Sequence, residues 1–355
     1  MNKYKLSKHV SVGEFGDKGV FGSGSKQILL EKGDWLDLIK ISSLWTTYKS
    51  VEEIEKETIE KFKSIAKEQI KKSIRFLKNG FLIKKYDHDN KIDHRYERNI
   101  RFYNYFTDDP DEVQIKIQDF KATLIGCGGI GNLISNMLVN SGVGEITLID
   151  DDVIEITNLT RQILFTENDV GKKKIDVLKN RLIERNSSAN INCIDLGIKK
   201  ESDIEKLGKS DLFIVSADSP RDFILWINKY AVKNKQAYIN VGYIGDIAVV
   251  GPFYIPGVTS CFECSQLFET QLDKETSDMY YYCNIINKDF KNITFPSTNG
   301  VAASYAFMDI IKFIGKFSEP LSMNKRIGIH MDKIFIETQH IHKNKECKIC
   351  SKIKY

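Results

Sequence analysis

The sequence lacks an excess of charge of either sign. Its 355 residues include 52 lysines and arginines against 48 aspartates and glutamates. A balance this even does not indicate a nucleic-acid or membrane-surface partner unless basic residues gather in one patch. The lysine-rich stretches at 172–174 and 343–348 are short, and a solvated surface is the simpler interpretation of them. We therefore expect no nucleic-acid partner.

Long hydrophobic runs are also absent. No apolar stretch approaches the length that crosses a bilayer, and none of signal-peptide length follows the polar residues 1–5. These absences predict a cytoplasmic protein without a membrane partner. Because that compartment keeps thiols reduced, the seven cysteines are interpreted as candidate metal ligands rather than as a disulfide framework.

The composition is that of an ordinary folded protein, with 42% hydrophobic and 28% charged residues. A chain of 355 residues exceeds what one hydrophobic core usually organises, so two domains are expected. We place a small domain at residues 1–90 and a larger one at residues 91–355.

The small domain is predicted to contain helices followed by a hairpin. Between Ser50 and Asn79, apolar residues recur at helical spacing with lysine and glutamate between them. Ser50 and Glu53 are a candidate capping box, and Asn79 with Gly80 is a candidate stop before the strand-like residues 81–83. This order of elements is typical of a winged-helix-like domain.

The larger domain alternates strands with helices after a polar linker at residues 87–94. The expected strands cover residues 122–125, 145–149 and 212–215, and the expected helices cover residues 132–140 and 172–185. This alternation indicates βαβ units on a mostly parallel sheet. Beyond them lie strand-like residues 248–253 and 326–337, a helix at 301–314, and a long polar segment at about 266–294. We interpret that segment as a loop that crosses the active face.

A glycine-rich loop follows the first of these strands. Residues 126–131 match the pattern G-x-G-x-x-G between a strand and a helix, where backbone N–H groups can bind phosphates. Gly126, Gly128, Gly129 and Gly131 are therefore candidate nucleotide-binding residues. Asp150 ends the next strand and is placed to bind a ribose hydroxyl. An NAD-dependent dehydrogenase fits these features equally well.

The next segment favours a triphosphate. Asn158-Leu-Thr-Arg161-Gln162 is followed by Asp-Val-Gly-Lys-Lys-Lys174. A hydride-transfer enzyme has no evident need for Arg161 and Lys174, whereas the β and γ phosphates require cationic donors.

Together these segments, with Ile-Asp-Asp-Asp at 149–152, resemble the ubiquitin-activating-enzyme-like adenylyltransferases, the superfamily of ThiF and MoeB. The resemblance implies a Rossmann-like α/β adenylation domain. It implies that Asp150 holds the ribose, that the triphosphate is bound by Asn158, Arg161 and Lys174, and that Mg²⁺ is bound by Asp218. The implied nucleotide site also contains Asp152 and Gln162.

Two of these roles have simpler alternatives. Asp218 follows an expected sheet strand, on the edge where α/β sites form, but it can instead cap the helix that begins near residue 223. By resemblance, Arg98 reaches the neighbouring triphosphate across a homodimer interface. An arginine in a basic segment is otherwise simply solvated.

Segments farther along resemble the microcin C-type peptide adenylyltransferases: residues 226–230, 238–243, 246–248 and 311–322. This resemblance implies a substrate that is a short ribosomal peptide ending in asparagine. It implies transfer of a nucleotidyl group from Mg-ATP or Mg-CTP to that residue, with release of pyrophosphate, in biosynthesis of a microcin C-like peptide–nucleotide antibiotic. The N-terminal domain would then clamp the peptide.

The cysteine pairs predict a metal site. Cys261 and Cys264, and Cys347 and Cys350, form two C-x-x-C pairs, which indicate a closed structural zinc site that ties the C-terminal tail to the main domain. Four buried or redox-active thiols are the alternative. Cys127 and Cys193 are interpreted as packing residues.

Cys283 lies in the expected crossing loop, where enzymes of the ubiquitin-activating class can carry an acceptor thiolate. Packing or chance is the simpler interpretation, because no nearby base or cation that would lower its pKa is apparent in the sequence.

Three other functions remain open. A sulfur-carrier activator would adenylate the Gly-Gly terminus of a ubiquitin-like protein, a nicotinamide oxidoreductase would bind NAD, and a noncatalytic scaffold would only bind a peptide. No residue obviously reads a base edge, so the sequence does not choose between ATP and CTP.

Overall fold

The computed structural model describes residues 2–85, 92–217, 219–220, 222–265, 282, 285–286, 288 and 293–351. The chain divides into two compact units, one of residues 1–117 with 315–318 and one of residues 118–314 with 319–355. Residues 92–117, which the sequence placed in the larger domain, group with the first unit. The assignment of residues 1–90 as a peptide clamp stays a prediction.

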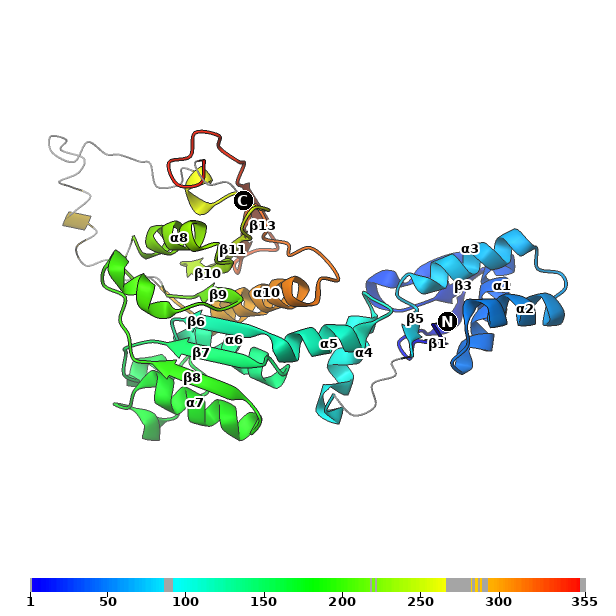
Figure 1. Ribbon diagram of the computed structural model, residues 1–355, viewed down its shortest axis with the longest axis horizontal. Helices are drawn as coiled ribbons and strands as arrows, with labels where there is room; N and C mark the ends of the chain where they lie inside the picture. The colour runs from blue at the N-terminus through cyan, green and yellow to red at the C-terminus, as the bar shows by residue number, and fades with distance from the viewer. Residues whose placement is uncertain are drawn as a thin grey trace. The chain divides into compact units, whose positions relative to one another are not determined.

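The first unit combines helices with two small antiparallel sheets (Figure 1). Its strands are β1 (Tyr4–Leu6), β2 (Val12–Phe15), β3 (Lys18–Phe21), β4 (Ile28–Glu31) and β5 (Leu82–Lys84). Its helices are α1 (Lys32–Ser43), α2 (Val51–Lys61), α3 (Lys67–Lys78), α4 (Glu97–Asn104) and α5 (Pro110–Asp119), with short turns η1 (Gly24–Lys26), η2 (Leu44–Thr46) and η3 (His94–Tyr96). One sheet has the order β2-β3-β4, and the other pairs β1 with β5.

Local signals explain the boundaries of these helices. The Ser50 hydroxyl accepts a hydrogen bond from the Glu53 backbone N–H at 3.2 Å, and the Glu53 carboxylate accepts one from the Ser50 N–H at 2.6 Å. The capping box that begins α2 is therefore confirmed. α3 ends at Lys78, before Gly80 with φ +88°. The expected hairpin is replaced by the pairing of β5 with β1, a contact too distant in sequence for a local pattern to show.

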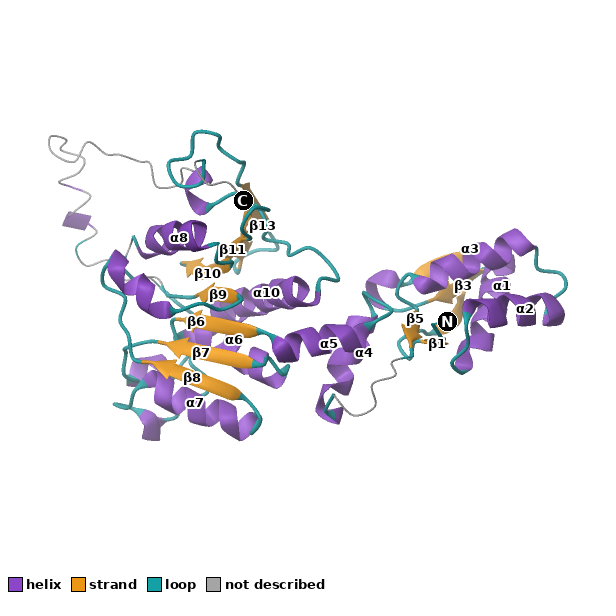
Figure 2. Ribbon diagram, in the orientation of Figure 1, coloured by secondary structure: helices purple, strands orange, loops and turns teal. Residues whose placement is uncertain are grey.

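The second unit is a mixed α/β domain built on an eight-stranded sheet (Figure 2). Its strands are β6 (Lys121–Ile125), β7 (Glu145–Ile149), β8 (Asn190–Ile194), β9 (Leu212–Val215), β10 (Tyr238–Ile244), β11 (Ile247–Tyr254), β12 (Lys325–His330) and β13 (Ile336–His340). Its helices are α6 (Gly129–Asn140), α7 (Lys174–Arg185), α8 (Phe223–Asn234) and α10 (Pro296–Gly315), with short turns η4 (Ile156–Asn158), η5 (Glu167–Asp169), η6 (Glu201–Leu207) and η7 (Phe262–Ser265).

The strand order places the ligand-binding edge of this sheet. The order is β13-β12-β11-β10-β9-β6-β7-β8, and the five strands from β10 to β8 are parallel neighbours. The chain leaves β6 toward β7 and β8, and then returns to the other side of β6 as β9. Right-handed crossovers in opposite directions put α6 and α7 on one face and α8 on the other. The switch point therefore lies between the carboxyl ends of β6 and β9.

The predicted Rossmann-like α/β fold with a mostly parallel sheet is confirmed. β6 and β9 are buried along nearly their whole length, which explains their continuous apolar sequences. Residues 326–337, expected as one strand-like stretch, form parts of β12 and β13, which pair with each other. Most of the expected crossing loop at 266–294 lies outside the described residues.

None of the helices in the described ranges combines the length and the apolar character that a membrane-spanning segment requires.

Candidate nucleotide-binding site and cysteine cluster

A cavity of about 720 Å³ opens at the switch point of the large sheet. Gly126 after β6, Asp150 after β7 and Ser216 after β9 line it. Its size lies within the range of about 300–1,000 Å³ that is usual for small-molecule sites. The fold thus assembles a ligand-sized cavity where α/β folds bind nucleotides.

The glycines of the loop serve two structural purposes. Gly126 has φ +93°, and a Cβ atom there would lie 2.7 Å from the Ala217 nitrogen, so this position requires glycine. A Cβ atom on Gly131 would lie 2.0 Å from the Gly126 oxygen, so Gly131 allows α6 to pack against the loop. Gly128 and Gly129 line the cavity at the start of α6, whereas Gly131 is not among the lining residues.

Asp150 is held in place by the glycine loop itself. Its carboxylate accepts hydrogen bonds from the Cys127 N–H at 2.6 Å and from the Asp152 N–H at 2.9 Å. Burial raises the pKa of Asp150, and the nearby Lys174 ammonium opposes that rise. Asp150 also lines the cavity, as the ribose-binding role requires.

Lys174 is a buried cation at the first position of α7. Only 6% of this residue is exposed, and its Nζ atom lies 2.7 Å from Oδ2 of Asp152. Both residues line the cavity. The Lys174 ammonium can therefore reach a bound anion only by sharing or exchanging its contact with the Asp152 carboxylate.

The segment that carries Asn158, Arg161 and Gln162 forms another wall of the cavity. The Asn158 side chain accepts a hydrogen bond from the Glu155 N–H at 3.1 Å, and the Arg161 guanidinium donates to the Thr157 carbonyl at 3.0 Å. Oε1 of Gln162 is buried and has no hydrogen-bond partner within the part of the chain that the structure describes.

The structure therefore brings most of the predicted nucleotide-binding residues to one cavity: Gly126, Gly128, Gly129, Asp150, Asp152, Asn158, Arg161, Gln162 and Lys174. Arg98 belongs to the first unit. Asp218, the expected Mg²⁺ ligand, lies outside the described residues, and its role stays a prediction.

Sequence analysis missed Asn299, which lies in the first turns of α10 and lines the same cavity. It also missed the wall formed by residues 196–199 after β8. No motif marks either position, because each reaches the cavity only through the folding of distant segments.

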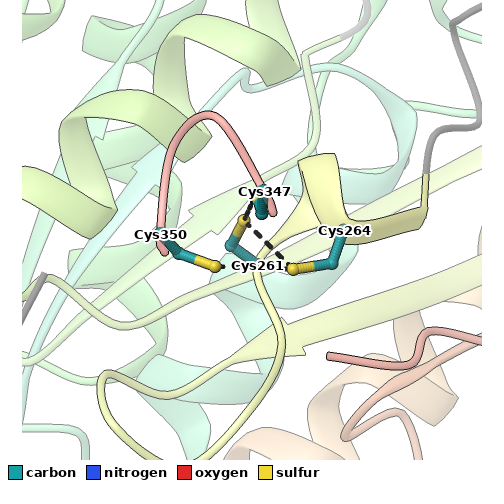
Figure 3. Close-up of side chains that lie close together, drawn as sticks. All are labelled: Cys261, Cys264, Cys347 and Cys350. Atoms are coloured by element: carbon teal, nitrogen blue, oxygen red, sulfur yellow. Dashed lines mark hydrogen bonds between the residues drawn. The ribbon is translucent and has the colours of Figure 1, made fainter. Parts of the chain in front are cut away.

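The four paired cysteines converge as predicted (Figure 3). Their sulfur atoms all lie within 4.8 Å of one another. The Sγ–Sγ distances are 3.8 Å for Cys261 and Cys264, 3.6 Å for Cys261 and Cys347, and 3.4 Å for Cys264 and Cys350. A tetrahedral Zn²⁺ with Zn–S bonds of about 2.3 Å separates its sulfur ligands by about 3.8 Å. The cluster therefore fits a closed structural zinc site.

The surroundings of the cluster suit bound thiolates. Burial and the mutual proximity of the sulfur atoms raise the pKa of Cys261, so a cation is needed to favour four thiolates. Lys343 donates to Cys350 Sγ at 3.2 Å. The pKa of Cys350 is lowered even though burial opposes this, because Lys343 and neighbouring cysteines donate to it.

The two other cysteines that the structure describes, Cys127 and Cys193, offer no evidence of nucleophilic chemistry. Cys127 is fully buried, and burial together with the Asp150 carboxylate raises its pKa well above the usual range. Cys193 is half-buried in β8, where burial also raises its pKa. Cys283 lies outside the described residues.

The fold is similar to that of known proteins. The structure is similar to a crystal structure of E. coli MccB, with a TM-score of 0.90 and 41% sequence identity over 98% of this chain and 96% of that chain. Another crystal structure of E. coli MccB contains ATP, and a structure of the microcin C7 biosynthetic enzyme MccB contains N-formylated MccA.

More distant relatives share parts of the sequence. The chain is 29% identical to the sulfur carrier protein ThiS adenylyltransferase of Bacillus subtilis over 153 residues, which are 42% of this chain and 45% of the relative. It is 25% identical to ubiquitin-like modifier-activating enzyme 5 of Caenorhabditis briggsae over 65% of this chain and 54% of the relative. The chain thus spans about half the length of these curated relatives.

The ThiF family model matches residues 96–349, a range that contains the glycine loop, the cationic segment and three of the four paired cysteines, Cys261, Cys264 and Cys347. With more than half of its length in this match, the chain belongs to the ThiF family.

Proposed function

We propose that this protein is a nucleotidyltransferase that adenylates or cytidylylates a short peptide ending in asparagine. The observation that carries the proposal is a nucleotide-sized cavity, lined by Asp150, Arg161 and Lys174, in a chain similar to E. coli MccB over 98% of its length. The crystal structures of E. coli MccB with ATP and with MccA support a nucleotide and a peptide as the two substrates. The proposed context is biosynthesis of a microcin C-like antibiotic in the cytoplasm.

The proposed reaction is attack by the terminal carboxyl or carboxamide group of the peptide on the α-phosphorus. A bond to that phosphorus forms, the bond between the α and β phosphates breaks, and pyrophosphate leaves. Arg161 and Lys174 would neutralise the charge that develops on the phosphates, and the N–H groups at Gly128 and Gly129 would bind their oxygens.

The proposal includes two further steps. The side-chain amide nitrogen attacks the activated carboxyl group, loses a proton and displaces the nucleoside monophosphate, which closes a succinimide. The succinimide nitrogen then loses its proton and attacks the α-phosphorus of a second triphosphate, and pyrophosphate leaves.

Three groups complete the proposed machinery. Mg²⁺, which neutralises phosphate charge when bound, would be held by Asp218. Arg98 would act on the triphosphate of the partner in a homodimer. Zn²⁺ would brace the four-cysteine cluster without taking part in the reaction, because a site with four protein ligands leaves no open position.

Pyrophosphate exchange tests the reaction directly. The protein is incubated with labelled pyrophosphate, ATP or CTP, and candidate peptides ending in asparagine. Incorporation of label into one triphosphate, dependent on the peptide, is expected. Asp218→Ala and Arg161→Ala should each abolish exchange, and full activity of either variant would contradict its assignment.

Activation of a ubiquitin-like sulfur carrier is the second candidate, because the Bacillus subtilis relative is a ThiS adenylyltransferase. Mass spectrometry after incubation separates the two: an adenylated Gly-Gly terminus on a folded carrier supports the second candidate, and a nucleotidylated peptide supports the first. Stabilisation in a thermal-shift assay by ATP or CTP, but not by NAD, would count against a nicotinamide oxidoreductase.

A further inference from the structure

The Asn299 side chain packs against Gly129 of the glycine loop. A Cβ atom on Gly129 would lie 2.7 Å from Oδ1 of Asn299 and 3.3 Å from Cγ of Arg161. The Asn299 residue is only 1% exposed, yet it lines the cavity. Its carboxamide is therefore packed beside the first turn of α6, where the backbone is placed to bind a phosphate.

Hydrogen bonds fix which end of this carboxamide faces the cavity. The Nδ2 atom donates to the Phe295 carbonyl at 2.8 Å and to the Thr294 hydroxyl at 2.9 Å. A backbone carbonyl can only accept, so the amino end must point toward residues 294–295. The Oδ1 end therefore points to the Gly129 side, and the described residues donate no hydrogen bond to it.

The Oδ1 end of Asn299 is an acceptor in a cavity whose candidate phosphate-binding groups are donors, although the carboxylates of Asp150, Asp152 and Glu155 also line it. Gly128, Gly129, Arg161 and Lys174 offer N–H groups or positive charge to phosphate oxygens. A carbonyl oxygen repels those same anionic oxygens and also repels a carboxylate. The group that meets Oδ1 must instead be a donor, an N–H or an O–H.

We infer that Asn299 is a specificity-determining residue that accepts a hydrogen bond from the N–H of the side-chain carboxamide of the peptide's terminal asparagine. This inference rests on the proposed function, and it favours asparagine over aspartate at the end of the acceptor peptide. The hydrogen bond orients the carboxamide beside the α-phosphate. A carboxylate at the same place meets the Oδ1 lone pairs and is disfavoured.

The ratio of kcat/KM for two peptides tests this inference, because the concentration of active enzyme cancels in such a ratio. The wild-type chain and Asn299→Leu are each given one peptide ending in asparagine and its counterpart ending in aspartate, and kcat/KM is measured for both. The wild type is expected to prefer asparagine by about 10-fold to 100-fold, the effect of one buried hydrogen bond. N299L is expected to lose most of that preference while its KM for the triphosphate changes little.

Asn234→Leu is the matched control. Nδ2 of Asn234 also donates to a carbonyl four residues earlier, that of Tyr230 at 2.9 Å, but Asn234 is exposed and lies outside the cavity. N234L should keep the wild-type ratio.

Two results would overturn this inference and leave the proposed function standing. One is an unchanged ratio of kcat/KM for the two peptides in N299L. The other is a raised KM for the triphosphate with that ratio preserved, which would indicate that Asn299 contacts the nucleotide. Absence of exchange by the wild type with every peptide would instead overturn the proposed function.

Discussion

Asp169 is a buried carboxylate that holds the segment leading to Lys174. It accepts hydrogen bonds from the Thr166 backbone and hydroxyl at 3.0 and 2.8 Å, and from Lys172 and Arg181, each at 3.2 Å. Burial alone would raise the pKa of Asp169, but these donors outweigh it and hold the pKa well below the usual range. The carboxylate therefore stabilises the fold in its ionised form.

Asp169→Asn is expected to lower the free energy of unfolding at neutral pH by about 1–3 kcal/mol, because hydrogen bonds to a charged acceptor are lost. A depressed pKa in the folded state contributes stability above the unfolded pKa of about 3.9, and this contribution is lost as the pH falls through the folded pKa. The difference between wild type and variant should therefore narrow in acid. Denaturant unfolding at several pH values measures it. A difference independent of pH would contradict the ionised role.

Lys174 supplies the buried cation of the proposed site. Lys174→Met should lower kcat/KM for pyrophosphate exchange by about 100-fold or more, as expected when a charge that stabilises the transition state is removed. Lys172→Met is the control, because Lys172 is exposed, pairs with Asp169 and is not among the cavity-lining residues. Similar losses of kcat/KM in both variants would show that the effect comes from disturbing residues 172–174 and not from removing the Lys174 cation.

At the level of elements, short-range signals fixed most of the structure. The strands expected at residues 145–149 and 212–215 coincide with β7 and β9. α10 begins at Pro296, five residues before the predicted start at Val301, because its first turn is polar and lacks the apolar pattern. The pattern shows where the chain is buried, and buried residues define the middle of an element better than its ends.

The capping box of α2 gives a prediction at this scale. Ser50→Ala removes the acceptor for the Glu53 N–H and is expected to lower the free energy of unfolding by about 1 kcal/mol. Ser43→Ala is the comparison, since the Ser43 hydroxyl donates to the Lys40 carbonyl and its side chain makes no capping hydrogen bond at the start of η2. Thermal unfolding followed by circular dichroism measures both. An equal or larger loss in S43A would contradict the capping role.

At the level of the whole molecule, the cysteine cluster joins segments far apart in the chain. Cys261 and Cys347 are separated by 86 positions, yet their sulfur atoms lie 3.6 Å apart. The cluster belongs to the same buried core as Phe223 and Ile227 of α8. The C-terminal tail is thereby tied to one face of the sheet (Figures 1 and 3).

Removal of one ligand tests the zinc brace. Cys347→Ala is expected to reduce bound zinc from about one ion per chain to nearly none, because a closed site needs its four ligands. The free energy of unfolding should fall by about 3 kcal/mol or more, as for the loss of any ligand held at over 100 times its Kd. Elemental analysis and denaturant unfolding measure the two effects. Cys193→Ala, outside the cluster, should keep the metal, and retention of zinc by C347A would contradict the site.

The sequence by itself determined the alternation of strands and helices, the glycine loop, the cationic segment and the two cysteine pairs. Each of these features depends on residues only a few positions apart. Their spacing follows from the hydrogen bonding of the local backbone or, for the cysteine pairs, from the geometry of metal binding. Only the tertiary structure decided the pairing of β1 with β5 and the place of Asn299 beside Gly129. Such contacts join residues distant in sequence, and they follow from how packed elements bury their surfaces, which no single local pattern records.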